Sequence, residues 1–209
     1  MTAQPPTLRP TLRLVLGDQL NPLHSWFAQV RPDVVYVLME VRSETDYVRH
    51  HAQKVLGIFA AMRDLAQQLK AGGHRVRYIA IDHASNRQSV TANLDALIAH
   101  YDASAVEYQS PDEWRLDQAL RGWAAACSVL VREVSSEHFF TERDEAQQLF
   151  AGKKQWLMES FYRQQRRRHR VLMTPDGQAE GGQWNFDADN RKPWPGTHEA
   201  PTDTRPQHD

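Results

Sequence analysis

Apolar and polar residues alternate along the first two thirds of the chain in two different periods. Apolar runs occupy residues 12–16 and 33–39, and the first of them is typical of a strand buried on both faces. Further, shorter strands are predicted at residues 74–81, 105–108 and 129–131. Between these runs, apolar residues recur with helical spacing, which predicts helices with one buried face over residues 55–69, 90–101 and 116–127.

Strands that alternate with helices in this way indicate βαβ units and a mostly parallel sheet. Right-handed crossovers leave a Rossmann-like or a flavodoxin-like strand order. We therefore predict an α/β fold: a Rossmann-like, doubly wound, mostly parallel five-stranded sheet with helices on both faces. No GxGxxG or GxxxxGK[ST] pattern occurs, so a phosphate cradle of the dinucleotide or nucleoside triphosphate type is not indicated.

Polar residues follow the first two predicted strands at the point where each ends. Gly17, Asp18 and Gln19 come directly after the first strand, and Glu40 ends the second. Ligands of open α/β sheets bind outside the carboxyl ends of the strands, so these side chains are candidate ligand contacts. The plainer interpretation is that Gly17-Asp18 is only a turn, and that Glu40 pairs with a nearby arginine such as Arg42.

A further helix is predicted over residues 153–170, with two opposed faces. Its apolar side carries Leu157, Met158 and Phe161. The other side carries an arginine stripe at i, i+3, i+4 and i+7, made of Arg163, Arg166, Arg167 and Arg170. Packing of the apolar side would expose the arginines. Such a stripe is usually a solvated face, but an anionic partner such as the phosphates of DNA would relieve the repulsion between like charges.

The segment 181–192 begins with two glycines and carries two aromatic residues, Trp184 and Phe186, without a regular period. It is too aromatic for a disordered linker, so we expect it to dock on another surface. The residues after Lys192 are rich in proline and polar residues, as an interdomain linker is. We expect a disordered tail at 1–10, a Rossmann-like domain at 11–170, and an interdomain connection with a truncated linker at 171–209.

Composition narrows the class of protein only slightly. In 209 residues, 25 lysines and arginines nearly cancel 26 acidic residues, so net charge argues neither for nor against a nucleic-acid partner. The single cysteine, Cys127, allows no disulfide and no cysteine-ligated metal cluster within the chain. Residues 1–10 do not form a secretory signal, and no apolar run could span a bilayer. We expect a monomeric cytoplasmic protein without a membrane partner.

Four stretches together resemble one family. They are Gly17-Asp18-Gln19-Leu20, Tyr47-Val48-Arg49-His50-His51, Lys154 to Tyr162, and Gly181-Gly182-x-Trp184-Asn185-Phe186-Asp187-x-x-Asn190-Arg191. Over residues 11 to 192 the chain resembles the N-terminal antenna domain of iron–sulfur bacterial cryptochromes and photolyases. This is the prokaryotic (6-4) photolyase, or deoxyribodipyrimidine photolyase-related, branch.

The resemblance implies a light-harvesting role in DNA repair. The antenna domain would bind 6,7-dimethyl-8-ribityllumazine, which passes excitation to FAD. FAD and a 4Fe-4S cluster would lie in a C-terminal helical domain absent from this chain, and the 181–192 segment would dock on that domain. The whole protein would bind damaged DNA, here through the arginine stripe. No residue of this chain would be catalytic or bind a metal. The pigment contacts it implies are Gly17, Asp18, Gln19, Leu20, Met39, Glu40, Tyr47 and His51.

Simpler roles remain open for several of these residues. His50 and His51 could cap the helix that follows, and Tyr47 could pack as a hydrophobic staple at its start. For the chain as a whole, the alternative is a stand-alone small-ligand binding or regulatory module on the same fold, without light chemistry.

Overall fold

The computed structural model describes residues 9–187, 191, 193, 196–197 and 199. The chain divides into two compact units, residues 1–140 and 141–209. The expected domain at 11–170 therefore covers the first unit and part of the second. Most of the expected disordered tail, residues 1–8, lies outside the described residues. Arg9 is held in place, because its guanidinium donates to the Asp102 carboxylate over 2.8 Å.

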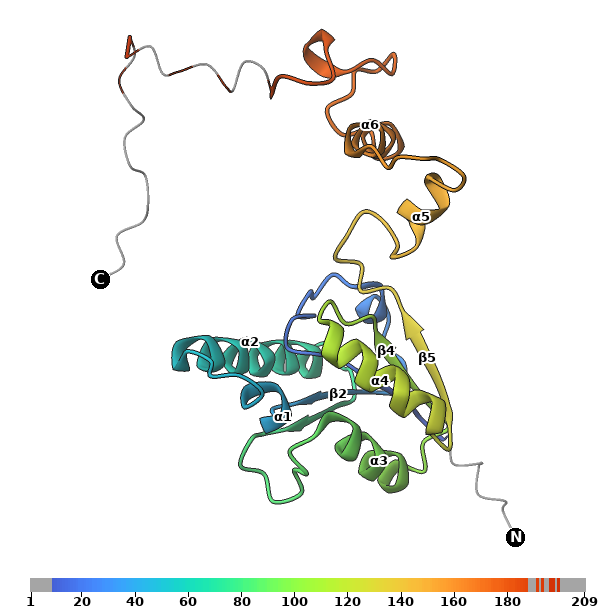
Figure 1. Cartoon of the computed structure of the whole chain (residues 1–209). Helices are drawn as coiled ribbons and strands as arrows, with labels where there is room; N and C mark the ends of the chain where they lie inside the picture. The colour runs from blue at the N-terminus through green and yellow to red at the C-terminus, as the bar shows by residue number, and fades with distance from the viewer. Residues whose placement is uncertain (1–8, 188–190, 192, 194–195, 198, 200–209) are drawn as a thin grey trace. The chain divides into compact units, whose positions relative to one another are not determined.

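The first unit is built on a five-stranded parallel sheet (Figure 1). Its strands are β1 (Thr11–Leu14), β2 (Val34–Met39), β3 (Val76–Ile79), β4 (Ala105–Gln109) and β5 (Leu130–Val134). Their order is β3-β2-β1-β4-β5, and each neighbouring pair is parallel. This is the Rossmann-like order rather than the flavodoxin-like one. The predicted α/β fold is confirmed, and the chain reverses direction across the sheet between β1 and β4.

Helices cover both faces of this sheet. They are α1 (Arg42–Thr45), α2 (Ala52–Ala71), α3 (Val90–Tyr101), α4 (Trp114–Ala126) and the short 3-10 helix η1 (Ser25–Phe27). On one face, α2 and η1 pack against Val34, Tyr36 and Leu38. On the other, α3 and α4 pack against Leu12 and Leu14 and the alternate residues of β2. Because successive strand residues point to opposite faces, a strand with both faces covered buries nearly all of its side chains, and β2 is apolar and buried at every position.

The second unit contains α5 (Glu145–Leu149), α6 (Met158–His169) and the 3-10 helix η2 (Glu180–Gly182). The helix predicted from residue 153 begins only at Met158. The preceding segment packs against α5 instead, since the Trp156 ring stacks on Phe150 with centroids 5.7 Å apart. Helix α5 was not predicted, because it is too short to show a helical period. Within the described residues, no helix has the length and apolar character needed to cross a bilayer.

The orientation predicted for the faces of α6 is correct for the exposed Arg167 and Arg170 but wrong for three other residues. Leu157 and Met158 are exposed, whereas Arg166 is buried. The Arg166 guanidinium donates to the backbone carbonyls of Val171 and Leu172, which follow the helix. A cation that bonds carbonyl groups at a helix C-terminus also interacts favourably with the helix dipole. Arg166 therefore stabilises the end of α6 rather than facing solvent.

Candidate functional site

A cavity of about 290 Å³ lies in the first unit, where β1 and β2 end. Residues of α1 and the turn after it, the first half of α2, and the starts of α3 and α4 form its walls. This is the edge at which open α/β sheets bind ligands, and the volume is at the small end of ligand pockets. The first two strands therefore lead into a cavity.

The apolar wall of the cavity comes mainly from α2. The predicted buried face of this helix is buried at Met62 and Leu65, but Val55, Ile58 and Phe59 are only half-buried. These three side chains line the cavity. The first turns of α2 therefore present an apolar surface that no other part of the described chain covers completely.

Polar side chains surround the same space. They are Asp18, Glu44, Thr45, Tyr47, His50, Lys54 and Glu113. The His50 Nε2 atom is buried and has no hydrogen-bond partner within the described part of the chain. A buried ring nitrogen without a partner costs free energy, and a polar ligand group would supply the missing bond.

The Asp18 carboxyl group is the acid nearest the end of β1. The residue is exposed in surface terms, yet its pKa is raised above the ordinary value. Partial burial of the carboxyl group is the largest cause, and the nearby acids Asp112 and Glu44 add to it. A backbone hydrogen bond and His138 act in the opposite direction. The Asp18 carboxyl group therefore lies partly shielded from water, near other acids, at the mouth of the cavity.

Arg115 connects the two sides of that mouth. Its guanidinium donates to Glu44 of α1 over 2.7 Å and lies 3.3 Å from the Glu113 carboxylate. It also lies over the Tyr47 ring, 4.1 Å from the centroid. An arginine that stacks on a ring and forms ion pairs at the same time loses little side-chain conformational entropy for each contact. Arg115 thus ties α1 and the following turn to the start of α4.

Four of the eight predicted pigment contacts line this cavity: Gly17, Asp18, Met39 and Tyr47. Gly17 is required by close packing, because a Cβ atom there would lie 2.9 Å from a methyl carbon of Ile58. The other four predicted contacts, Gln19, Leu20, Glu40 and His51, are not among the lining residues.

Gln19 is buried and its amide is used inside the protein. The side-chain oxygen accepts from the backbone N–H of Leu16, and the side-chain nitrogen donates to the carbonyls of Gln109 and Ser110. Gln19 therefore joins the carboxyl ends of β1 and β4. Leu20 packs into the core on the α2 side of the sheet.

Glu40 is fully buried and forms an internal ion pair. Its two oxygens accept from the Arg63 guanidinium over 2.7 and 3.0 Å, from the Tyr78 hydroxyl over 2.5 Å, and from the backbone N–H of Ile81 over 2.8 Å. The plainer interpretation, an arginine partner, fits this geometry, but the partner is Arg63 and not Arg42.

His51 is the N-cap of α2, since its Nδ1 atom accepts from the backbone N–H of Gln53. It therefore has the capping role that the sequence left open. His50, Lys54 and Glu113 line the cavity without having been predicted as contacts. His50 belongs to a quoted motif, but nothing in the sequence distinguished the lining histidine from its capping neighbour.

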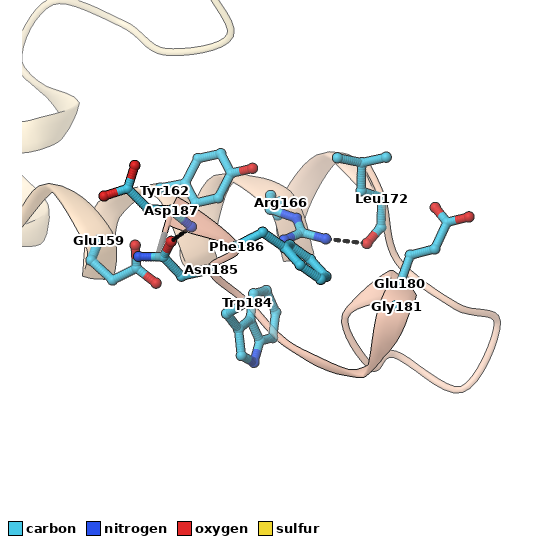
Figure 2. Close-up of a pocket in the computed structure, with 10 residues that line it drawn as sticks. All are labelled: Glu159, Tyr162, Arg166, Leu172, Glu180, Gly181, Trp184, Asn185, Phe186 and Asp187. Atoms are coloured by element: carbon cyan, nitrogen blue, oxygen red, sulfur yellow. Dashed lines mark hydrogen bonds between the residues drawn. The ribbon is translucent and has the colours of Figure 1, made fainter. Parts of the chain in front are cut away.

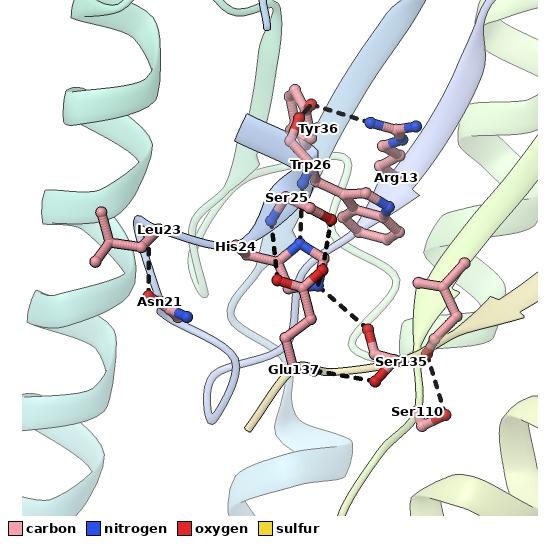
Figure 3. A network of polar contacts seen from close by, with 11 residues as sticks. Arg13, Asn21, Leu23, His24, Ser25, Trp26, Tyr36, Ser110, Ser135 and Glu137 are labelled. Carbon is pink, nitrogen blue, oxygen red and sulfur yellow. Dashed lines mark hydrogen bonds and ion pairs between the residues drawn. The ribbon is translucent and has the colours of Figure 1, made fainter. Parts of the chain in front are cut away.

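A second polar network joins η1 to the segment after β5 (Figure 3). The buried His24 ring accepts from the Trp26 N–H through Nδ1, and its Nε2 lies 3.2 Å from the Ser135 carbonyl. Ser25 donates both its N–H and its hydroxyl to Glu137. The Ser25 hydroxyl is bonded to a carboxylate and not to the histidine, so the group does not form a nucleophile and base pair.

The second unit has its own open cavity of about 570 Å³ beside α6 (Figure 2). The Trp184 ring lies over three guanidinium groups, with centroid distances of 5.6 Å to Arg163, 5.1 Å to Arg166 and 4.6 Å to Arg167. Phe186 packs against Gly181. The start of the 181–192 segment therefore docks on α6 of this chain, while residues 188–190 and 192 lie outside the described residues.

In the part of the chain that the structure describes, no group of three or more His, Cys, Asp or Glu side chains could hold a metal ion. The cysteine, Cys127, is free and half-buried.

A parallel sheet in Rossmann-like order, with a cavity at its carboxyl edge, defines a doubly wound α/β domain. Residues 13–209 match the family model described as deoxyribodipyrimidine photo-lyase-related protein. The chain belongs to this photolyase-related family, as its motifs predicted. It is 39% identical over 199 residues to a (6-4) photolyase of Agrobacterium fabrum (strain C58 / ATCC 33970). That match covers 94% of this chain and 38% of the relative, so the chain spans about two fifths of that protein's length.

Proposed function

We propose that this chain is the light-harvesting antenna domain of a photolyase of the cryptochrome/photolyase family, and that its cavity binds 6,7-dimethyl-8-ribityllumazine. The observation that carries the proposal is the cavity itself, which combines an apolar wall on α2 with hydrogen-bonding groups at the mouth. A flat pteridine ring needs the first, and a ribityl chain needs the second.

The residues present fit such a ligand. Ile58 and Phe59 offer apolar surface to the ring, and His50 offers a nitrogen that lacks a partner within the described chain. Asp18 and Glu44 supply acceptors for ribityl hydroxyl groups. The bound lumazine absorbs light and passes excitation energy to FAD. The chain's own part is to hold the ring in a fixed orientation, away from water.

FAD and the 4Fe-4S cluster belong, in this proposal, to a C-terminal helical domain outside this chain. A four-cysteine cluster cannot form here because the chain has one cysteine. Light-driven repair of damaged DNA is accordingly proposed for the whole protein and not for these 209 residues. The stand-alone binding or regulatory module stays as the alternative if the lumazine does not bind.

The first prediction tests the pigment site. Titrating the chain with the lumazine, followed by ligand fluorescence, is expected to give saturable binding. Asp18→Ala should weaken it by about 2- to 10-fold, since one lost hydrogen bond costs about 0.5–1.5 kcal/mol. The matched control is Asp64→Ala, which removes an exposed carboxylate of α2 outside the cavity. Absence of binding to the wild type, or equal affinity in the two variants, contradicts the assignment.

The second prediction concerns the DNA contact that we propose for the arginine stripe. Arg167 and Arg170 remain exposed on α6, whereas Arg166 is used internally and Arg163 bonds Glu159. An Arg167→Gln, Arg170→Gln variant should bind duplex DNA less tightly than the wild type. The slope of log affinity against log salt should fall by about 1.8, or 0.9 for each phosphate contact.

The control for the DNA measurement is Arg168→Gln. This residue lies on the same helix and is also exposed, but it bonds Glu145. A decrease in slope of about 0.9 in Arg168→Gln, half of that in the double variant, would mean a general effect of each removed charge. An unchanged slope in the double variant would show that the stripe is solvated surface.

A further inference from the structure

The start of α4 lies at the edge of the sheet where open α/β folds bind ligands. The chain reverses direction between β1 and β4, and the helix after β4 points its N-terminus at that switch point. Free backbone N–H groups and the helix dipole make such an N-terminus attractive to anions. Any ligand in the cavity lies close to this helix start, because Glu113 and Leu116 line it.

A carboxylate of the protein already fills this anion position. Glu113 is the N-cap of α4, and its two oxygens accept from the backbone N–H groups of Arg115 and Leu116, each over 2.9 Å. At the start of α2, the His51 ring accepts the Gln53 N–H in the same way. At the start of α3, which has no side-chain cap, the residue that lines the cavity is the buried and apolar Val90.

The charges around the cavity also disfavour a second anion. Three carboxylates line it, those of Asp18, Glu44 and Glu113, against one lysine, Lys54. Arg115 pairs with Glu44 and Glu113, so that together with Lys54 it leaves one carboxylate in excess. Like charges that meet without water between them repel strongly. A phosphate group would therefore meet an excess of negative charge and a helix start that is already capped.

We propose that the cavity selects ribityl ligands without a phosphate group, and that Glu113 is a residue that determines this specificity. The ligand class is a neutral pteridine- or flavin-type ring with a free polyhydroxylated chain. This inference depends on the proposed pigment site, and it specifies that the site accepts the pigment without a phosphate group.

The test compares 6,7-dimethyl-8-ribityllumazine with its 5′-phosphate ester, each titrated into the chain and followed by fluorescence. In the wild type, the ester should bind at least about tenfold more weakly, which corresponds to about 1.4 kcal/mol. In Glu113→Gln, this ratio should fall below about threefold, because the competing charge is removed while one acceptor remains for the helix. Asp82→Asn is the control, since it removes an exposed carboxylate outside the cavity and should keep the wild-type ratio.

The possible results separate the two proposals. If the lumazine and its ester bind the wild type equally, the phosphate exclusion is wrong and the pigment site stands. If neither binds, the pigment site itself is wrong, and the exclusion with it. If Glu113→Gln keeps the wild-type ratio, Glu113 does not determine specificity. Should Glu113→Gln fail to fold, Asp18→Asn gives the same test at the other side of the mouth, and an unchanged ratio there overturns the electrostatic argument.

Discussion

A Glu40→Ala variant is expected to unfold with a free energy about 2–4 kcal/mol lower than the wild type, because it removes one partner of a buried, hydrogen-bonded ion pair. The change leaves Arg63, the Tyr78 hydroxyl and the Ile81 N–H without their acceptor. Arg63 is half-exposed and can be hydrated, so the low end of the usual range for broken buried pairs applies. Urea unfolding followed by circular dichroism measures the change.

The effect should depend on pH in a defined direction. Burial acts to raise the pKa of Glu40, but bonds from Arg63, Tyr78 and the Ile81 N–H outweigh it, so the pKa is lowered from 4.5. A carboxyl group with a lowered pKa stabilises the fold above its unfolded pKa and loses this contribution as pH falls through the folded value. The stability gap between wild type and Glu40→Gln should therefore be complete at pH 7 and shrink below about pH 4.5.

Arg63→Ala and Arg42→Ala form a matched pair for the same site. Arg63 bonds Glu40, whereas Arg42 is exposed and lies 3.9 Å from Asp46. Arg63→Ala should lower the free energy of unfolding by a substantial part of the decrease expected for Glu40→Ala. Arg42→Ala should not, because isolated surface ion pairs contribute about 0–1 kcal/mol. Equal stability of Glu40→Ala and the wild type at pH 7 would refute the ion pair as a stabilising element.

Val55→Trp is expected to abolish lumazine binding while the domain stays folded. Val55 is half-buried on the cavity wall, and an indole ring there would occupy much of a cavity of about 290 Å³. Affinity should fall by at least about 100-fold, since loss of the apolar contacts of a ring is worth several kcal/mol. The measurement is the fluorescence titration used for the wild type, together with thermal unfolding.

Leu56→Trp is the control for that change. Leu56 is the next residue of α2, but it is 67% exposed and does not line the cavity. The same indole ring should there leave the lumazine affinity within about twofold of the wild type. If both variants bind the lumazine like the wild type, the pigment does not occupy this cavity, even if the chain binds it elsewhere.

The fold could be predicted because it depends on periodic patterns. The continuous apolar run of β2 and the helical spacing of apolar residues on α2 can each be recognised within a short stretch of sequence. The sequence left two possible strand orders, Rossmann-like and flavodoxin-like, because the same alternation of strands and helices is found in both folds. The faces of α6 show a different limit. Periodicity fixed the angle between Arg166 and Met158 around the helix, but the buried side was decided by the carbonyls after the helix and by Trp184.

The site could be predicted in position but only in part by residue. Asp18 and Glu40 are the same kind of signal, an acid at the end of a strand, yet one lines the cavity and the other is bonded internally. The difference depends on Arg63 and Tyr78, which lie 23 and 38 positions after Glu40. No local pattern links these residues. Likewise, apolar residues recur with the same spacing in the first turns of α2, which line the cavity, and in its later turns, which are buried. The spacing alone therefore does not show which turns face the cavity.

The strand order has a consequence for how the chain folds during synthesis. β1 pairs with β4 as well as with β2, and Thr11 of β1 is matched with Ala105. Strands β1 to β3 can pair as soon as they leave the ribosome, but one edge of β1 then stays open until residues of β4 emerge. An unpaired edge of apolar residues invites association with other chains. Between the pairing of β1 to β3 and the emergence of β4, nascent chains are therefore vulnerable to aggregation. A chaperone that binds during this interval would protect them.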